Sequence, residues 1–217
     1  MTRVVLIHGA ASSAGVWARL TPLLVDCEVF AVTRPRSGDL AAELAWLAPR
    51  VEGSWVVGMS GGATLGLALA ASGTRLAGAV LHEPAVGSLT PGLLAPMTAA
   101  FAAGGTTAFA HTLYGASWTP ETSGGPGPWL EDAVTERELA MFRDFEPAPA
   151  TSTAGRVLVT YGERSPAIRR EAAEALAAAH GYQVQVMPGA AHFAAYDAAE
   201  EFAHTVLGHA ERAVPPH

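Results

Sequence analysis

Six short runs of apolar residues alternate along the chain with longer segments whose apolar residues recur at helical spacing. The apolar runs predict β-strands at residues 3–8, 28–33, 54–59, 76–82, 156–161 and 183–187. Helices are expected near residues 14–25, 39–51, 61–72, 166–180 and 193–208. Strands that alternate with helices in this way are typical of an α/β fold with a parallel sheet. The pattern therefore predicts three layers, a doubly wound and mostly parallel six-stranded sheet with helices on both faces.

One long segment, residues 84–155, interrupts this alternation. It carries helical patterns near 91–103, 105–114 and 129–145, with a stretch rich in proline and glycine at 119–128. We therefore expect a helical insertion at 84–155, carried by a core that comprises residues 1–83 and 156–208. Residues 209–217 are expected to form a tail.

The predicted sheet also suggests where a ligand binds. In an open parallel sheet, ligands bind at the carboxyl ends of the strands, where the strand order reverses. A strand order of 2-1-3-4-5-6 puts this point between the first and third strands. These strands end in His8-Gly9-Ala10 and in Met59-Ser60, so both segments are candidate site residues.

Composition narrows the class of protein. A chain of 217 residues suits one domain, and no apolar run reaches the ~20 residues of a membrane span. The net charge of −7, without a basic cluster, argues against a nucleic-acid partner. Cys27 is the single cysteine, which excludes an internal disulfide. With no signal-peptide pattern at the N-terminus, these features favour the cytoplasm.

The sequence Gly58-Met59-Ser60-Gly61-Gly62 carries the strongest chemical signal. A G-x-S-x-G motif between a strand and a helix predicts a nucleophile elbow, a sharp turn that exposes the serine hydroxyl. The flanking glycines let strand and helix approach closely. The helix N-terminus behind the serine favours a developing negative charge. Ser60 is therefore the candidate nucleophile.

Two further segments extend the pattern. Residues 4–10, Val-Val-Leu-Ile-His-Gly-Ala, run into a His-Gly turn, and residues 187–193 place His192 just after the last strand. With the serine elbow between them, this order resembles the α/β-hydrolase family over nearly the whole chain. Compared with larger members of that family, the chain lacks the two leading strands. The resemblance implies that residues 84–155 form a lid.

The resemblance also implies roles for individual residues. His192 is the expected general base, with an apparent pKa of roughly 6–7.5, since a carboxylate partner raises the pKa of a histidine. The backbone N–H groups of Gly61 and Ala10 are the expected oxyanion donors. His8 is expected to support its loop without taking part in the chemistry.

The acid that would orient His192 is less evident. The position where the family usually carries an Asp holds Ser165, which fits an N-cap followed by Pro166 as the first helical residue. Glu83 lies at the carboxyl end of the fourth strand, where some branches of the family carry a carboxylate. An ionised group at the end of a buried strand needs a partner. Glu83 is therefore the preferred acid, with Glu163 or no acid as alternatives.

Together these residues predict a serine hydrolase that cleaves an ester, thioester or lactone through an acyl-enzyme. Ser60, His192 and Glu83 are its expected catalytic residues, and a small, largely apolar molecule is its expected substrate. No metal, cofactor or membrane partner is implied. A cofactor-free lyase, cyclase or oxygenase that uses the same Ser-His pair is one alternative, and a non-enzymatic binder of a small molecule is another. The oligomeric state and the natural substrate stay undetermined.

Overall fold

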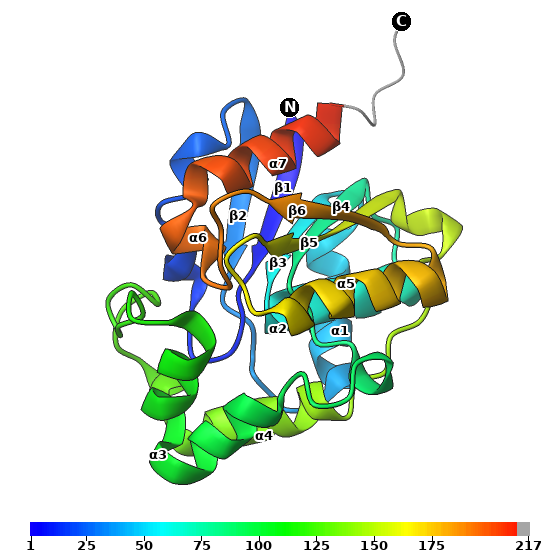
Figure 1. The fold of residues 1–217 in the computed structure, drawn as a ribbon. Helices are drawn as coiled ribbons and strands as arrows, with labels where there is room; N and C mark the ends of the chain where they lie inside the picture. The colour runs from blue at the N-terminus through cyan, green and yellow to red at the C-terminus, as the bar shows by residue number, and fades with distance from the viewer. Residues whose placement is uncertain (212–217) are drawn as a thin grey trace, which may run out of the picture.

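The computed structural model describes residues 1–211 and contains one six-stranded sheet (Figure 1). Every pair of neighbouring strands is parallel, and the strand order is β2-β1-β3-β4-β5-β6. This confirms the predicted sheet, its order and the reversal between β1 and β3. The strands are β1 (Thr2–Ile7), β2 (Cys27–Val32), β3 (Trp55–Met59), β4 (Gly78–His82), β5 (Arg156–Gly162) and β6 (Gln183–Met187).

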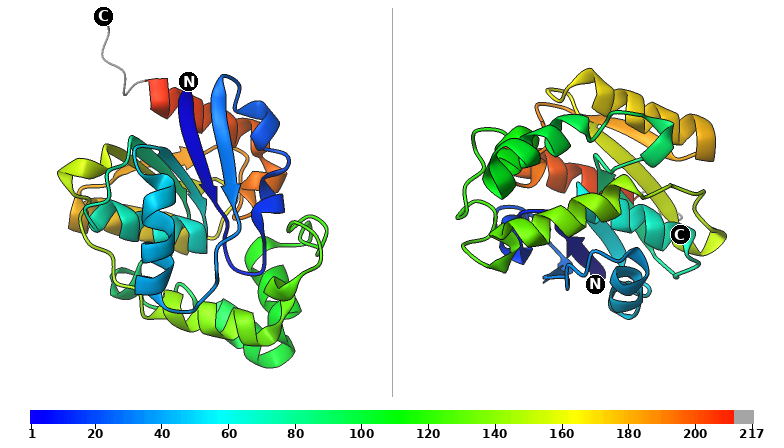
Figure 2. Two further views of the ribbon diagram at one scale, coloured as in Figure 1. Left: turned by 180° about the vertical axis from the view of Figure 1, so that it is seen from behind. Right: turned by 90° about the horizontal axis from the view of Figure 1, so that it is seen from below.

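Helices cover both faces of the sheet, as Figure 2 shows from behind and from below. One face carries α1 (Leu40–Val51), α2 (Gly61–Ala71) and α5 (Ala167–His180). The other carries α7 (Ala199–Glu211), preceded by the single turn α6 (Ala194–Asp197). The three-layer α/β architecture is thereby confirmed.

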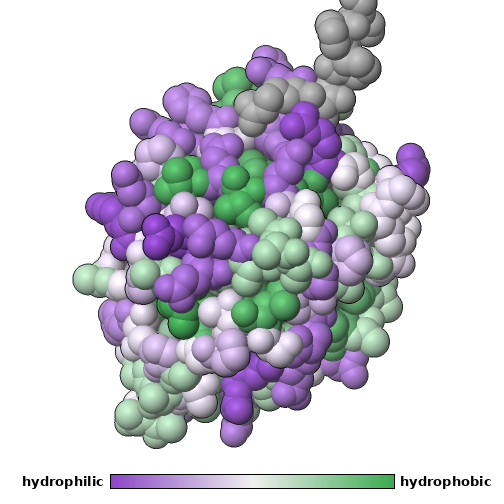
Figure 3. All heavy atoms as spheres, turned by 45° about the vertical axis from the view of Figure 1, so that its right-hand side comes forward, coloured by the Kyte–Doolittle hydropathy of each residue, from purple (hydrophilic) through white to green (hydrophobic). Residues whose placement is uncertain are grey.

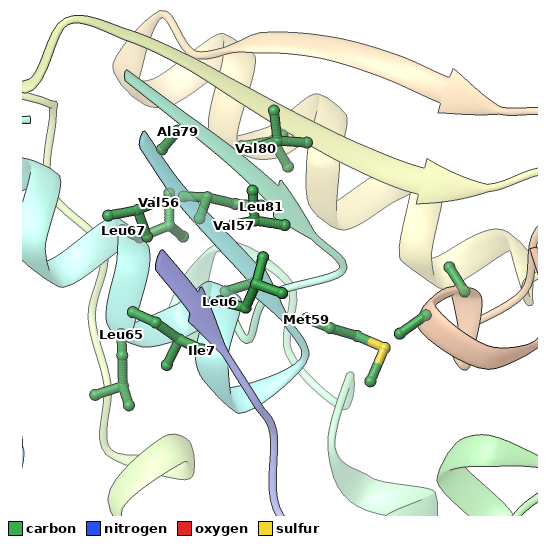
Figure 4. Packing of buried hydrophobic residues seen from close by; sticks show 14 of the residues in the cluster. Leu6, Ile7, Val56, Val57, Met59, Leu65, Leu67, Ala79, Val80 and Leu81 are labelled. Atoms are coloured by element: carbon green, nitrogen blue, oxygen red, sulfur yellow. The ribbon is translucent and has the colours of Figure 1, made fainter. Parts of the chain in front are cut away.

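The core holds the central strands in place. All residues of β3 and β4 are buried, and Val56, Val57, Val80 and Leu81 have no exposed surface (Figure 4). Burying one such aliphatic side chain stabilises the fold by roughly 1.5–3 kcal/mol. Ser60 and Glu83 directly follow β3 and β4, so both residues are attached to the tightly packed centre of the sheet.

The insertion between β4 and β5 lies beyond the carboxyl ends of the strands (Figures 1 and 2). It contains α3 (Ala95–Tyr114), α4 (Asp132–Arg143) and the 3₁₀ turns η3 (Gly87–Leu89), η4 (Pro128–Leu130) and η5 (Ser152–Ala154). Gly104 and Gly105 have non-helical backbone angles that break α3 in two. This break coincides with the boundary expected between the helical patterns at 91–103 and 105–114.

Three local predictions were wrong. Residues 14–25 form two 3₁₀ turns, η1 (Ala14–Trp17) and η2 (Thr21–Leu23), instead of one helix, since Pro22 lacks the N–H that a continuing helix needs. Helix α5 begins at Ala167 with Pro166 as its N-cap, and the Ser165 side chain caps nothing. Residues 209–211, expected in a tail, continue α7, and the rest of that tail lies outside the described residues.

The surface in Figure 3 shows hydrophobic side chains in separate patches among hydrophilic ones. Within residues 1–211, no helix combines the length and the apolar character that crossing a membrane requires. The same residues hold no cluster of three or more His, Cys, Asp or Glu side chains that could bind a metal ion.

Candidate active site

Ser60 occupies a strained turn between β3 and α2. Its φ of 57° and ψ of −124° lie outside the regions that non-glycine residues favour, and such strain is common at functional sites. The turn is fixed by Ser60 N–H, which donates to His82 O at 2.9 Å. A Cβ atom on Gly62 would collide with the carbonyl oxygen of Ile7. The motif therefore needs glycine there, and it forms the predicted elbow.

His192 lies on the turn between β6 and α6, and hydrogen bonds from neighbouring segments fix this turn. The His82 ring donates through Nε2–H to Ala191 O at 3.0 Å and accepts at Nδ1 from the Thr160 hydroxyl, also at 3.0 Å. Arg164 N–H donates to Ala190 O at 2.8 Å. The backbone of His82 thus holds Ser60, and its ring holds the residue before His192. His82, for which the sequence offered no role, links the two halves of the site.

Glu83 and His192 form a buried pair. His192 Nδ1–H donates to Glu83 Oε2 at 2.7 Å, and the other carboxylate oxygen accepts from Gly162 N–H at 2.8 Å. The Arg169 guanidinium on α5 lies 3.5 Å from Glu83 Oε2. Glu83 and His192 are 2% and 5% exposed. Because Nδ1 carries the proton, Nε2 of the neutral ring is free to accept one, and it has no hydrogen-bond partner within residues 1–211.

The surroundings set the charge of this pair. Burial alone would raise the pKa of Glu83, but the hydrogen bond to His192 and the nearby His82, His192 and Arg169 hold its pKa well below the usual range. Burial, together with the charge of Arg169, lowers the pKa of His192 to about 4, although Glu83 partly opposes this shift. The predicted apparent pKa of 6–7.5 counted the carboxylate and omitted desolvation and Arg169, both of which act in the opposite direction.

The alternative acids lie elsewhere. Glu163 accepts from Gly189 N–H at 2.8 Å in an exposed turn, so its carboxylate supports the β6 connection. The Ser165 hydroxyl is buried without a hydrogen-bond partner among the described residues. Among the candidate acids, Glu83 is the one that the structure brings to His192.

The loop after β1 carries the expected oxyanion donor Ala10. Its amide and the amide of Gly61 donate to no other group within residues 1–211. Both are buried, so these N–H groups suit a ligand oxygen. His8, also fully buried, accepts from Arg34 N–H at Nε2 at 3.3 Å, which agrees with a supporting role.

A cluster of buried charges, which the sequence analysis missed, holds this loop. The Arg34 guanidinium lies 3.4 Å from Glu43 and contacts Glu138 of α4, and all three side chains have no exposed surface. Arg34 also donates to His8 O at 3.1 Å and Gly9 O at 3.2 Å. The loop that carries Ala10 is therefore tied both to the core and to the insertion.

Arg36 completes what we call the buried ion cluster: Arg34, Arg36, Glu43 and Glu138. Its guanidinium lies 3.2 Å from Glu138 and donates to Ser12 O. Two arginines directly after a strand, at the carboxyl edge of the sheet, were a signal that the sequence offered. Their partner Glu138 lies 104 residues beyond Arg34 in the chain, and no local pattern identifies it.

Aromatic side chains of the insertion also bind the loop after β1 through hydrogen bonds. The Tyr114 hydroxyl donates to Ala10 O at 2.7 Å, and Trp118 Nε1–H donates to Ala11 O at 3.2 Å. The Ser13 N–H donates to Ser123 O at 2.8 Å. These contacts hold the insertion against the site, where it covers Ser60, which is 8% exposed.

Comparison with known proteins identifies the family of this chain. The model of the alpha/beta hydrolase family matches residues 4–205, so the chain belongs to this family and is an enzyme of this class. No curated protein sequence matches significantly.

Solved structures show the same fold. NosK from Streptomyces actuosus aligns with a TM-score of 0.71 and 20% identity over 98% of both chains. The enol-lactonase from Burkholderia xenovorans LB400 aligns with a TM-score of 0.68 and 18% identity over 95% of this chain and 90% of its own. Carboxylesterase CesB (YbfK) from Bacillus subtilis aligns with a TM-score of 0.65 and 16% identity over 95% of this chain and 82% of its own.

Proposed function

We propose that this hydrolase cleaves an ester, thioester or lactone through a covalent acyl-enzyme on Ser60. The observation that carries the proposal is the buried pair of Glu83 and His192 beside the strained Ser60 elbow. The pair fixes the tautomer that leaves Nε2 of His192 as a proton acceptor. A serine hydroxyl needs such a base, because it is a weak nucleophile at neutral pH.

The proposed steps follow from these positions. Ser60 Oγ attacks the carbonyl carbon and gives its proton to Nε2 of His192, while the carbonyl electron pair moves to oxygen. The amides of Ala10 and Gly61 stabilise the oxyanion, and Glu83 stabilises the imidazolium. His192 then protonates the leaving oxygen or sulfur. Water, activated by the same histidine, releases the acyl group.

An apolar cavity beside the elbow supports a largely apolar substrate. It has a volume of about 510 Å³ and is lined mainly by apolar side chains of α3, α4 and the segment after β4, among them Ala85, Leu93 and Ala99. Phe142 of α4 lines the cavity, and its ring also packs against Gly61. The cavity thus begins one aromatic ring away from the elbow, where the apolar part of an acyl group would extend.

Labelling with a fluorophosphonate tests the function. Intact-mass analysis should show one adduct on the wild-type protein, mapped to Ser60 and absent from Ser60→Ala. Ser165→Ala is a matched control, because its buried hydroxyl makes no hydrogen bond and its loss should leave labelling unchanged. A folded wild-type protein that forms no adduct, or forms it elsewhere, would favour the lyase, cyclase, oxygenase or binder alternative.

The pH dependence tests the state of His192. Because the base acts in its neutral form and its pKa is lowered to about 4, kcat/KM should stay on its plateau at pH 6 and fall only as the pH approaches 4. Removing a positive charge raises the pKa of His192, so Arg169→Met should move this acid limb to higher pH. Arg170→Met, at an exposed neighbour, should not move it. Hydrolysis of p-nitrophenyl acetate, followed at the isosbestic wavelength of the product, measures the profile. A wild-type limb centred between pH 6 and 7.5 would show that the pKa of His192 is not lowered by its surroundings.

A further inference from the structure

Tyr114, the last residue of α3, reaches from the insertion into the site. It is 3% exposed, and its hydroxyl donates to Ala10 O at 2.7 Å. Its ring centroid lies 5.4 Å from that of His192 and 4.9 Å from that of Phe193. These two ring contacts and the hydrogen bond to Ala10 O therefore fix the direction in which the hydroxyl points.

The Tyr114 hydroxyl also lies at the nucleophile. The Tyr114 hydroxyl oxygen and the Ser60 side chain both border the backbone of Gly9. A Cβ atom built on Gly9 would lie 2.7 Å from the Tyr114 hydroxyl oxygen and 2.9 Å from Ser60 Cβ. The phenol oxygen, the nucleophile and the backbone next to the Ala10 amide thus meet in one small space. An oxyanion bound by Ala10 would form in this space.

The acceptor beside Tyr114 determines where its hydroxyl proton lies before a substrate reacts. Tyr114 has one hydroxyl proton, and Ala10 O, which can only accept, takes it. Nε2 of His192, which has no hydrogen-bond partner among the described residues, stays available to accept the Ser60 proton. Burial raises the pKa of Tyr114 to about 12, although the nearby Ser60 and Ser12 side chains partly oppose this. The phenol stays a donor throughout the neutral range.

We propose that Tyr114 is a catalytic residue, the third oxyanion donor beside the amides of Ala10 and Gly61. The inference rests on the proposed acyl-enzyme mechanism. When Ser60 turns to His192 and its Oγ bonds to the carbonyl carbon, the proton passes to Nε2 and the carbonyl electron pair moves to oxygen. The Tyr114 O–H then turns from Ala10 O to this oxyanion and keeps its proton throughout. A hydrogen bond to an ionised acceptor is roughly twice as strong as one between neutral groups, so the exchange favours the transition state.

Tyr114→Phe tests the proposal, because it keeps the ring packing and removes only the hydroxyl. Loss of one oxyanion donor typically lowers kcat by 10²–10³-fold, and we expect a loss of roughly 10²-fold for p-nitrophenyl esters, since two amides remain. The KM should change by less than about threefold, since the bond forms only with the oxyanion. The inhibition constant of a trifluoromethyl ketone, which forms a tetrahedral adduct on serine, should rise in parallel with the fall in kcat.

Trp118→Phe is the matched control. It removes the neighbouring hydrogen bond from the insertion, to Ala11 O, and should leave kcat within about threefold of wild type. Equal losses in both variants would overturn the proposal, because they would show that the insertion only clamps the loop. Wild-type kcat in Tyr114→Phe, or faster fluorophosphonate labelling, would overturn it too, since Tyr114 would then merely restrain Ser60.

A second variant covers the case in which Tyr114→Phe fails to fold. Incorporation of 3,5-difluorotyrosine at position 114 keeps the hydroxyl but makes it more acidic. Activity of this protein should be lost at an alkaline pH at which the wild type remains active, as the donor ionises. An unchanged alkaline profile would count against the proposal. Failure of the acyl-enzyme mechanism itself is separate, because it would appear as a missing Ser60 adduct in the wild-type protein.

Discussion

Replacing His192 by Ala is expected to lower kcat for p-nitrophenyl esters by roughly 10⁶-fold, the scale on which a serine hydrolase loses its base. Nε2 of His192 has no hydrogen-bond partner among the described residues and is therefore free to act as the base, whereas alanine offers no acceptor in its place. His204→Ala, at an exposed position of α7, should keep wild-type turnover. Both variants should be compared by kcat and by melting temperature.

The alanine variant also leaves the buried Glu83 carboxylate without its histidine. His192→Gln separates this effect from the loss of the base, since its amide can still donate to Glu83 while it cannot act as a general base. We expect this variant to melt closer to the wild type and to be equally inactive. Turnover within tenfold of wild type in either folded variant would refute the role of His192.

Glu83→Gln should lower kcat by roughly 10⁴-fold, as the corresponding Asp-to-Asn change does in a serine protease. The reason lies in the hydrogen bonds. Gly162 N–H requires an acceptor, so the amide oxygen of the introduced glutamine would face Gly162 and its NH₂ group would face His192. His192 would then accept at Nδ1 and carry its proton on Nε2, the tautomer that cannot deprotonate Ser60.

Glu163→Gln provides the comparison, because that carboxylate is exposed and supports only the turn at Gly189. It should retain at least half of the wild-type kcat. If Glu83→Gln were to keep activity within tenfold of wild type, Glu83 would be a structural residue only.

Much of the fold could be read from the sequence because it depends on local patterns. Parallel strands buried on both faces form nearly continuous apolar runs, and β3 and β4 show this clearly. The break at Gly104 could also be anticipated. The single helix predicted for residues 14–25 was wrong, because the apolar pattern suits a helix but Pro22 lacks the backbone N–H that a continuous helix needs. Periodicity reports burial, and backbone hydrogen bonds then decide the local conformation.

In the candidate site, too, the residues within local motifs could be predicted and those that depend on long-range contacts could not. Ser60 and His192 sit in short motifs whose turns are encoded by adjacent residues. The hydroxyl of Tyr114 donates to Ala10 O, which lies 104 residues away in the sequence, and Arg34 and Glu138 are separated by the same number of residues. Such partners depend on how the insertion docks, which the pattern of a single chain does not contain. The lowering of the His192 pKa could not be anticipated for a related reason, since it depends on burial and on Arg169 of another helix.

The buried ion cluster has a consequence for chimeric enzymes. A chimeric enzyme can be designed by replacing the insertion between β4 and β5 with that of a relative, as if the insertion were independent of the core. Here such a graft would remove Glu138 and leave Arg34 and Arg36 charged in the interior. Breaking a buried ion pair from one side costs roughly 3–5 kcal/mol, a large part of the roughly 5–15 kcal/mol that typically holds a domain folded. An insertion placed on this core must therefore supply a carboxylate where Glu138 lies, or the two arginines must be replaced together with the insertion.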